Sequence, residues 1–130
     1  MAAFDFDGIG KGFVQQYYQI FASNRAACAG IYRPNSLMTW SGKSMQGGAA
    51  IMEKFGTLTF QPGTAFNPRE IECHPTPGNG VLVVVNGELA QPDEAHQLSF
   101  NDVFHLCTDQ AGQWYVANQL FKVLGGGGHA

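Results

Sequence analysis

The first third of the chain carries the apolar repeat of an amphipathic helix. Phe13, Tyr17 and Phe21 recur at four-residue steps, and glutamines occupy the positions between them. Steps of this length place the three rings on one helical face, so we predict a helix from about Gly10 to Asn24. Asp5 and the acid two residues later precede its first turn, where negative charge is favoured by the helix dipole.

Two shorter helices are expected on either side of a short strand. Asn24 is a suitable cap for a helix over Arg25–Tyr32, which Pro34 would end. Leu37–Trp40 is predicted as a strand that leads into a turn. A third helix is predicted to open at Gly47-Gly48, with an inner stripe of Ala50, Ile51, Phe55 and Leu58.

The second half of the chain has the pattern of long strands. Ala65–Cys73 is a candidate strand with a proline inside it, and Val81–Val85 is apolar at every position, which is typical of a strand covered on both faces. Leu98–Thr108 and Gln113–Leu124 flank Asp109–Gly112 and are predicted to form a hairpin.

Helices followed by hairpin-linked strands predict an α+β domain, with three helices packed on one face of a strongly curved antiparallel sheet. Short helices cannot cover both faces of four long strands. We therefore expect the sheet to curl around a cavity and its outer face to meet a second copy of the chain. Residues 1–124 would form this domain, and the glycine-rich residues 125–130 a flexible tail.

Composition and charge restrict the classes of binding partner that we expect. Hydrophobic residues make up 45% of the chain and charged residues only 13%, which excludes a disordered, highly charged segment. The net charge is −3 and the seven Lys and Arg residues are scattered, so we expect neither nucleic acid nor a membrane as partner. Three cysteines without a Cys-x-x-Cys motif and a start without a leader pattern favour a reducing compartment, the cytosol or the nucleus.

Signals for catalysis are weak. The histidines and cysteines lack the spacing of metal ligands, and no Gly-x-Ser-x-Gly motif is present, so we expect no metal, no cofactor and no nucleophile. Asp102 is in phase with Phe100 and Phe104. It therefore points either into a pocket, as a general acid or base would, or lies at a strand end or an interface.

The combination of aromatic and acidic residues is more informative. Trp40 ends a predicted strand, and Phe121 lies in the last one. Leu58 and Phe60 follow the third helix, while Asp93 and Glu94 lie in a loop. These residues either line and rim a cavity for one inserted aromatic side chain, or form ordinary core and a solvated loop.

Short segments that match those of one known family, in the same order along the chain, extend from about Phe6 to Leu124. They comprise Phe13-Val14-Gln15-Gln16-Tyr17-Tyr18 with Phe21, Asn24-Arg25, Ile31-Tyr32, Leu37-Met38-Thr39-Trp40, Gln46-Gly47, Ile51-Met52-Glu53-Lys54, Leu58-Thr59-Phe60-Gln61, Pro75-Thr76-Pro77, Asn86-Gly87-Glu88-Leu89, Phe104-His105-Leu106 and Trp114-Tyr115-Val116-Ala117-Asn118-Gln119-Leu120-Phe121. With these segments the chain resembles the nuclear transport factor 2 family, the small dimeric carriers of the GTPase Ran.

The resemblance implies a cone-shaped α+β fold, a homodimer built through the sheets, and binding without catalysis. Ran-GDP would insert a Phe ring into a cavity that includes Trp40, Leu58, Phe60 and Phe121, and its basic side chain would meet acids at Asp93 and Glu94. Nucleoporins with FxFG repeats would dock at the nucleoporin-binding residues Phe4, Phe6, Pro75 and Pro77. The protein would occupy cytoplasm and nucleus, enriched at the nuclear envelope and pore.

One departure from the family bears on the rim. The family places Glu after the cavity aromatic, and this chain has Ser41, which removes one acid. Two other functions fit the same fold: an isomerase or dehydratase, and an adaptor subunit of an RNA-export receptor. An inward carboxyl of raised pKa beside a Tyr or His would favour the enzyme, whereas an all-apolar pocket with acids only at its mouth would count against it.

Overall fold

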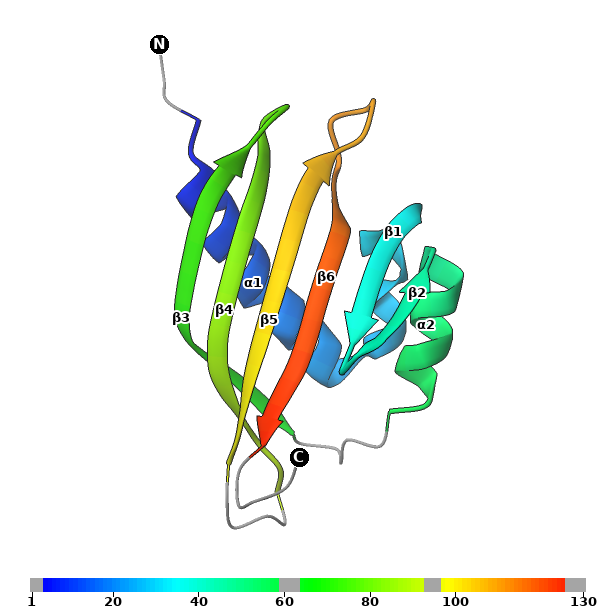
Figure 1. Cartoon of the computed structure of the whole chain (residues 1–130), viewed down its shortest axis with the longest axis vertical. Helices are drawn as coiled ribbons and strands as arrows, with labels where there is room; N and C mark the ends of the chain where they lie inside the picture. Colours follow the sequence, from blue (N-terminus) through cyan, green and yellow to red (C-terminus); the bar gives the residue numbers. More distant parts are fainter. Residues whose placement is uncertain (1–3, 59–63, 93–96, 126–130) are drawn as a thin grey trace.

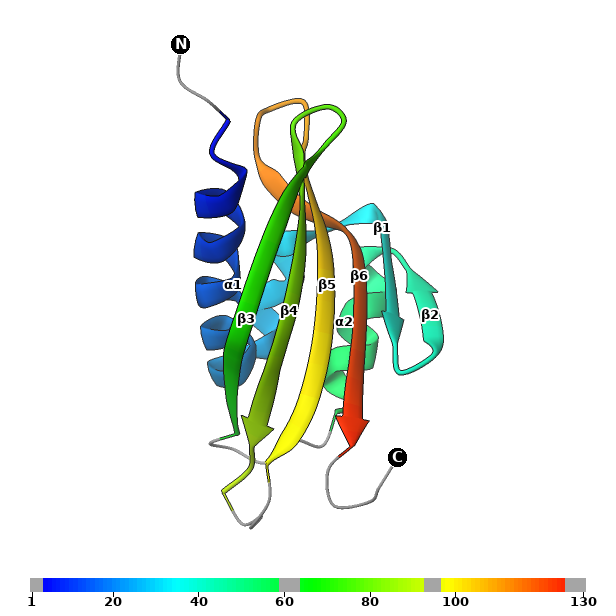
Figure 2. The same ribbon diagram turned by 60° about the vertical axis from the view of Figure 1, so that its left-hand side comes forward.

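The computed structural model describes residues 4–58, 64–92 and 97–125. Within them the chain forms the helices α1 (Phe6–Ser23) and α2 (Gly48–Gly56) and the 3-10 helix η1 (Arg25–Ile31). The strands are β1 (Tyr32–Trp40), β2 (Lys43–Gln46), β3 (Ala65–Thr76), β4 (Gly80–Ala90), β5 (Leu98–Thr108) and β6 (Trp114–Gly125). The helices lie on one side of the long strands, as Figures 1 and 2 show.

The six strands form one curved sheet in the order β2-β1-β6-β5-β4-β3. All neighbours are antiparallel except β1 and β6, which are parallel and place Trp40 beside Phe121. The predicted three-helix α+β cone is confirmed. The parallel pair was not predicted, because a pairing between distant segments leaves no local pattern in the sequence. Strand β2, which pairs with β1 across the Ser41-Gly42 turn, was not predicted either.

Helix α1 begins at Phe6, earlier than the pattern predicted, because Asp5 caps it. The Asp5 carboxylate accepts a hydrogen bond from the Gly8 amide at 3.0 Å, which satisfies one of the free amides of the first turn. The helix then lies against β3 (Figure 1). A side chain in place of Gly10 would collide with Cys73 of β3, so this glycine permits the close approach.

Prolines mark irregularities within strands. Pro34 lies inside β1, where the register against β6 shifts between Tyr32 and Leu37, and η1 already ends at Ile31. The register of β3 against β4 shifts between Pro68 and Glu70, as expected for a residue that cannot donate a ladder hydrogen bond.

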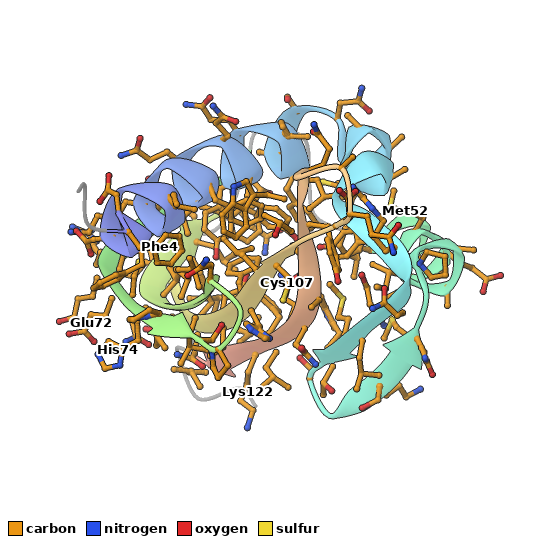
Figure 3. The ribbon with its side chains drawn as sticks, turned by 90° about the horizontal axis from the view of Figure 1, so that it is seen from above. Phe4, Met52, Glu72, His74, Cys107 and Lys122 are labelled. Atoms are coloured by element: carbon orange, nitrogen blue, oxygen red, sulfur yellow. The ribbon has the colours of Figure 1, made fainter. Side chains whose placement is uncertain are left out.

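The core lies between α1, α2 and the concave face of the sheet. Val81, Val83 and Val85 of β4 are fully buried there, while Leu82 and Val84 face the other side. Strand β5 alternates in the same way, with Phe100, Phe104 and Leu106 buried. This alternation leaves a second, convex face that no described helix covers, and Lys122 and His74 point away from the helices in Figure 3.

Candidate functional site

An aromatic crevice lies between α1 and the end of β1. The Trp40 and Phe121 rings stack with their centroids 4.2 Å apart, and the Phe21 ring lies 6.3 Å from Trp40. The described lining residues are Tyr17, Tyr18, Phe21, Trp40, Phe66, Asp102 and Phe121. The space between them is too narrow to hold a water molecule. The crevice is therefore closed in this conformation.

Local structure explains why these rings meet. Trp40 is the last residue of β1, and the parallel register with β6 sets it beside Phe121. The tight turn after it includes Ser41 and Gly42 with positive φ angles of 49° and 90°. Tyr17 and Phe21 project from one face of α1, four residues apart, toward the same point. The indole is 8% exposed and lies next to the turn.

A chain of polar side chains forms the floor of the crevice. The Tyr18 hydroxyl donates to Asp102 Oδ2 at 2.8 Å, and Gln119 Nε2 donates to Asp102 Oδ1 at 3.0 Å. The Tyr32 hydroxyl donates to Gln119 Oε1 at 2.6 Å and lies 3.0 Å from the Tyr17 hydroxyl. Among the described residues, every buried side-chain nitrogen or oxygen has a hydrogen-bond partner. The network is therefore fully satisfied and ties α1 to β1, β5 and β6.

Asp102 is fully buried, and its environment changes its protonation. Burial raises the pKa of this carboxyl from its ordinary 3.8 to about 8, although the hydrogen bonds from Gln119 and Tyr18 lower it in part. Burial likewise raises the pKa of the Tyr18 hydroxyl well above its usual range. The protonated form is therefore favoured at neutral pH, which avoids an isolated buried charge. In that form the Asp102 hydroxyl donates to the Tyr18 oxygen 2.8 Å away, and the direction of this hydrogen bond reverses.

The structure resolves the alternatives for Asp102. It points inward, as its phase with Phe100 and Phe104 allowed, and not into an interface or at a strand end. This is the carboxyl that would favour an enzyme: its pKa is raised and it adjoins a tyrosine. Both of its oxygens, however, are already hydrogen-bonded to the protein, and the crevice leaves no space for a small molecule beside them.

Not every predicted cavity residue lines the crevice. Trp40 and Phe121 do, whereas Leu58 is partly buried after α2, where its carbonyl accepts a hydrogen bond from Arg25 Nη1 at 3.4 Å. Phe60, Asp93 and Glu94 lie outside the described residues. Sequence reasoning missed Tyr18 and Phe66 as lining residues. The signal for Tyr18 was its place beside Tyr17 in the amphipathic helix.

The residues predicted to bind nucleoporins lie toward one end of the molecule. Phe4 and Phe6, at the start of α1, are partly buried against the core. Pro75 pairs with Val81 near the end of β3, and Pro77 follows in the exposed turn to β4. Figures 1 and 2 place the start of α1 and this turn at the same end, and Figure 3 labels Phe4 there.

The convex face of the sheet carries apolar side chains. We call it the outer face and define it by Leu82, Val84, Val103, His105 and Leu120. The side chain of Leu120 is 53% exposed, and a shallow groove of about 250 Å³ passes beside it, lined by Thr76, Leu82, Val103, His105, Asn118 and Leu120. An exposed apolar surface of this kind is typical of a protein-protein interface.

Within the described part of the chain, no three His, Cys, Asp or Glu side chains lie close enough together to hold a metal ion. No helix of the described residues combines the length and apolar character needed to cross a membrane. The described residues present two features: an aromatic crevice on the concave side of the sheet and an open apolar face on the other.

Comparisons with known proteins find relatives over nearly the whole chain. The family model of the nuclear transport factor 2 (NTF2) domain matches residues 9–123. Nuclear transport factor 2B of Arabidopsis thaliana is 36% identical over 124 residues, covering 95% of this chain and 98% of that protein. The structure of nuclear transport factor 2 from Cryptosporidium parvum superposes with a TM-score of 0.85 at 42% identity, covering 91% of this chain and 94% of that one.

The fold alone is shared more widely. The Candida albicans Mtr2-Mex67 M domain complex contains a chain that superposes with a TM-score of 0.70 at 15% identity, covering 90% of this chain and 94% of that one. The fold is thus that of a cone-shaped α+β protein. The family match and the identity over nearly the whole chain go further: the chain belongs to the nuclear transport factor 2 family. Its function is that of a nuclear transport factor.

Proposed function

We propose that this nuclear transport factor carries Ran in its GDP-bound form. The observation that carries the proposal is the stack of Trp40 on Phe121 at the edge of the aromatic crevice. An inserted Phe ring would find rings on several sides there. Burying one Phe side chain stabilises a complex by about 1.5–3 kcal/mol.

Insertion requires the crevice to open. Because Trp40 is 8% exposed and adjoins the Ser41-Gly42 turn, a rotation of its indole would open the space. The partner ring would then replace part of the Trp40–Phe121 contact. GDP selectivity would come from Ran itself, whose switch segment would present the ring in one nucleotide state.

Two acidic residues, Asp93 and Glu94, would select the basic partner. Asp93 and Glu94 follow β4 in the chain, and the net charge of −3 favours approach of a basic side chain. Ser41 stands where the family has Glu, so Asp93 and Glu94 carry the whole of this role. Such pairs mainly orient the partner and speed encounter.

The outer face would hold a second copy of the chain in a homodimer. Leu120 is half exposed at the groove, and the neighbouring Leu82, Val84 and Val103 extend the apolar surface. A twofold axis would pack this patch against the same patch of the second copy. Each of its apolar side chains would then be buried in both copies.

Phe-rich nucleoporin repeats would dock at Phe4, Phe6, Pro75 and Pro77, at the end of the molecule where α1 begins. Two partly buried rings beside a proline-bearing turn offer a small apolar contact. Single contacts of this size are weak, and many repeats supply avidity. The protein would then shuttle between cytoplasm and nucleus and gather at the pore, without nucleic acid or membrane as partner.

The experiment is a calorimetric titration of Ran-GDP into the parent, Trp40→Ala and Met38→Ala. Met38 is fully buried on the same strand but does not line the crevice, so it controls for lost core packing. We expect Trp40→Ala to abolish binding and Met38→Ala to keep it, with both variants dimeric in sedimentation. Equal affinity of Trp40→Ala and parent would refute the cavity assignment.

A proton-transfer enzyme is the second candidate, favoured by the raised pKa of Asp102 beside Tyr18 in the crevice. A thermal-shift screen with small apolar carbonyl compounds tests it. Saturable stabilisation of the parent that Asp102→Asn abolishes would support an enzyme; no stabilisation would leave Asp102 with a structural role.

A further inference from the structure

The apolar groove of the outer face contains a histidine. Its described lining residues are Thr76, Leu82, Val103, His105, Asn118 and Leu120. The imidazole of His105 is partly buried among them. Histidine is the side chain whose charge ordinarily changes between pH 5 and 8. Among the described lining residues, a change of pH in this range therefore acts on His105 alone.

The hydrogen bonds of the imidazole suit both of its charge states. His105 Nδ1 lies 3.3 Å from Asn118 Oδ1, and Nε2 lies 3.0 Å from the Thr76 hydroxyl oxygen. An amide oxygen only accepts hydrogen bonds, so Nδ1 donates to Asn118, and the Thr76 hydroxyl donates to Nε2 of the neutral ring. When Nε2 takes up a proton, the hydroxyl rotates and accepts from it. The charged ring therefore needs no rearrangement of the strands.

The groove provides no negative charge to balance a protonated imidazole. No carboxylate lines it among the described residues. The neighbour of His105 on β4 is Leu82, and the neighbour on β6 is Asn118. On β5 itself, Cys107 Sγ lies 3.6 Å from Nε2, and burial raises the pKa of this thiol, so it stays uncharged as pH falls. A proton on His105 therefore leaves a net positive charge in the groove.

The charged and titratable side chains on the same face lie farther away. His74 pairs with Leu82 and so faces the same side of the sheet, with Glu72 two residues before it on β3. Strand β4 separates both from His105, and Figure 3 shows them together at the β3 edge. Lys122 lies farther along β6. None of these three side chains lines the groove.

We propose that protonation of His105 dissociates the homodimer, which makes the outer face a pH-sensitive interface. This switch depends on the homodimer of the proposed function. A twofold axis would bury one His105 from each copy. Because transfer of a charged group from water into an apolar interface is unfavourable, the dimer excludes the proton that a separate chain binds. Acidification therefore shifts the equilibrium toward separate chains.

The direction of this effect distinguishes it from an effect of net charge. The chain carries a net charge of −3 with its histidines neutral, and acidification makes this charge less negative. Weaker repulsion between the copies would by itself strengthen their association as pH falls. A dimer that weakens instead reports a charge gained inside the interface.

The test is the dimer dissociation constant from sedimentation equilibrium at pH 8.0, 7.0 and 6.0 and constant ionic strength. For the parent it should rise about tenfold from pH 8.0 to 6.0, because each dissociating dimer can bind two protons. His105→Gln should remove this dependence, and the control His74→Gln should keep it. His105→Lys should dimerise weakly at all three pH values. A circular-dichroism melt of each variant confirms folding.

The outcomes separate the switch from the proposed function. A parent dissociation constant that stays the same from pH 8.0 to 6.0 would overturn the switch and leave the homodimer. A pH dependence that persists in His105→Gln, or disappears in His74→Gln, would also overturn it. A parent that is a single chain at every pH would overturn the homodimer and the switch together. Ran-GDP affinity, measured at pH 7.0 alongside, reports separately on the carrier function.

Discussion

The Tyr18 hydroxyl donates a hydrogen bond of 2.8 Å to the buried carboxyl of Asp102. This contact joins α1 to β5 beneath the aromatic crevice, and Gln119 extends it to β6. A polar floor under an apolar crevice has two consequences: stability depends on the protonation of Asp102, and the Tyr17 and Tyr18 rings are held by their hydroxyls.

The free energy of unfolding is predicted to fall as pH rises from about 4 to 8. The Asp102 pKa is about 8 in the folded state and near the ordinary 3.8 in the unfolded state, so in this window the folded state holds a proton that the unfolded state has released. The contribution amounts to about 1.4 kcal/mol per pH unit. Asp102→Asn should remove it.

Urea unfolding of parent and Asp102→Asn at pH 5, 6 and 7 measures this effect. At each higher pH, the unfolding free energy of the parent should fall relative to that of Asp102→Asn. If the difference between the two unfolding free energies is the same at all three pH values, Asp102 does not titrate as described.

The helices and hairpins could be predicted because their signals are local. The four-residue steps of Phe13, Tyr17 and Phe21 define α1, and the alternation along β5 placed Phe100 and Phe104 on one face. The start of α1 was set too late, because Asp5 acts through a single capping hydrogen bond. Strand β3 continues to Thr76, three residues beyond the predicted end at Cys73.

The site could be predicted only in part. Resemblance to the family located Trp40 and Phe121, but their stacking depends on the parallel pairing of β1 with β6, which no local pattern encodes. The polar floor was equally hidden, because Tyr18, Asp102 and Gln119 come from three distant segments. The one local signal for the polar floor was the phase of Asp102 with Phe100 and Phe104, which allowed its side chain to point inward.

Leu120→Asp is predicted to break the homodimer. Each copy would lose a half-exposed leucine from the outer face and place a charge there, which should weaken association at least about 100-fold. Sedimentation velocity checks the result, with Gln15→Asp on the exposed side of α1 as control. A dimer in Leu120→Asp as stable as in the parent would exclude the outer face as the interface.

Phe6→Ala is predicted to reduce capture on FxFG-repeat resin about tenfold while Ran-GDP affinity stays the same, because Phe6 lies outside the crevice lining. Ile20→Ala, a partly buried position near the other end of α1, should bind both partners like the parent. Parallel loss of both partners in Phe6→Ala would point to damage of the fold.

Glu94→Lys is predicted to weaken Ran-GDP binding at least about tenfold, and lowering the salt should deepen the defect, because like charges repel more when screening falls. Glu53→Lys, an exposed reversal on α2, controls for net charge. If Glu94→Lys binds Ran-GDP as tightly as the parent at low ionic strength, Glu94 does not contribute to Ran binding.

The most direct measurement is the affinity of the parent for Ran loaded in turn with GDP and with a non-hydrolysable GTP analogue, under identical buffer and salt. We predict saturable binding of Ran-GDP and at least about 100-fold weaker binding of the GTP form. Equal affinity for the two forms, or no binding to either, would contradict a Ran-GDP carrier built around the Trp40–Phe121 crevice.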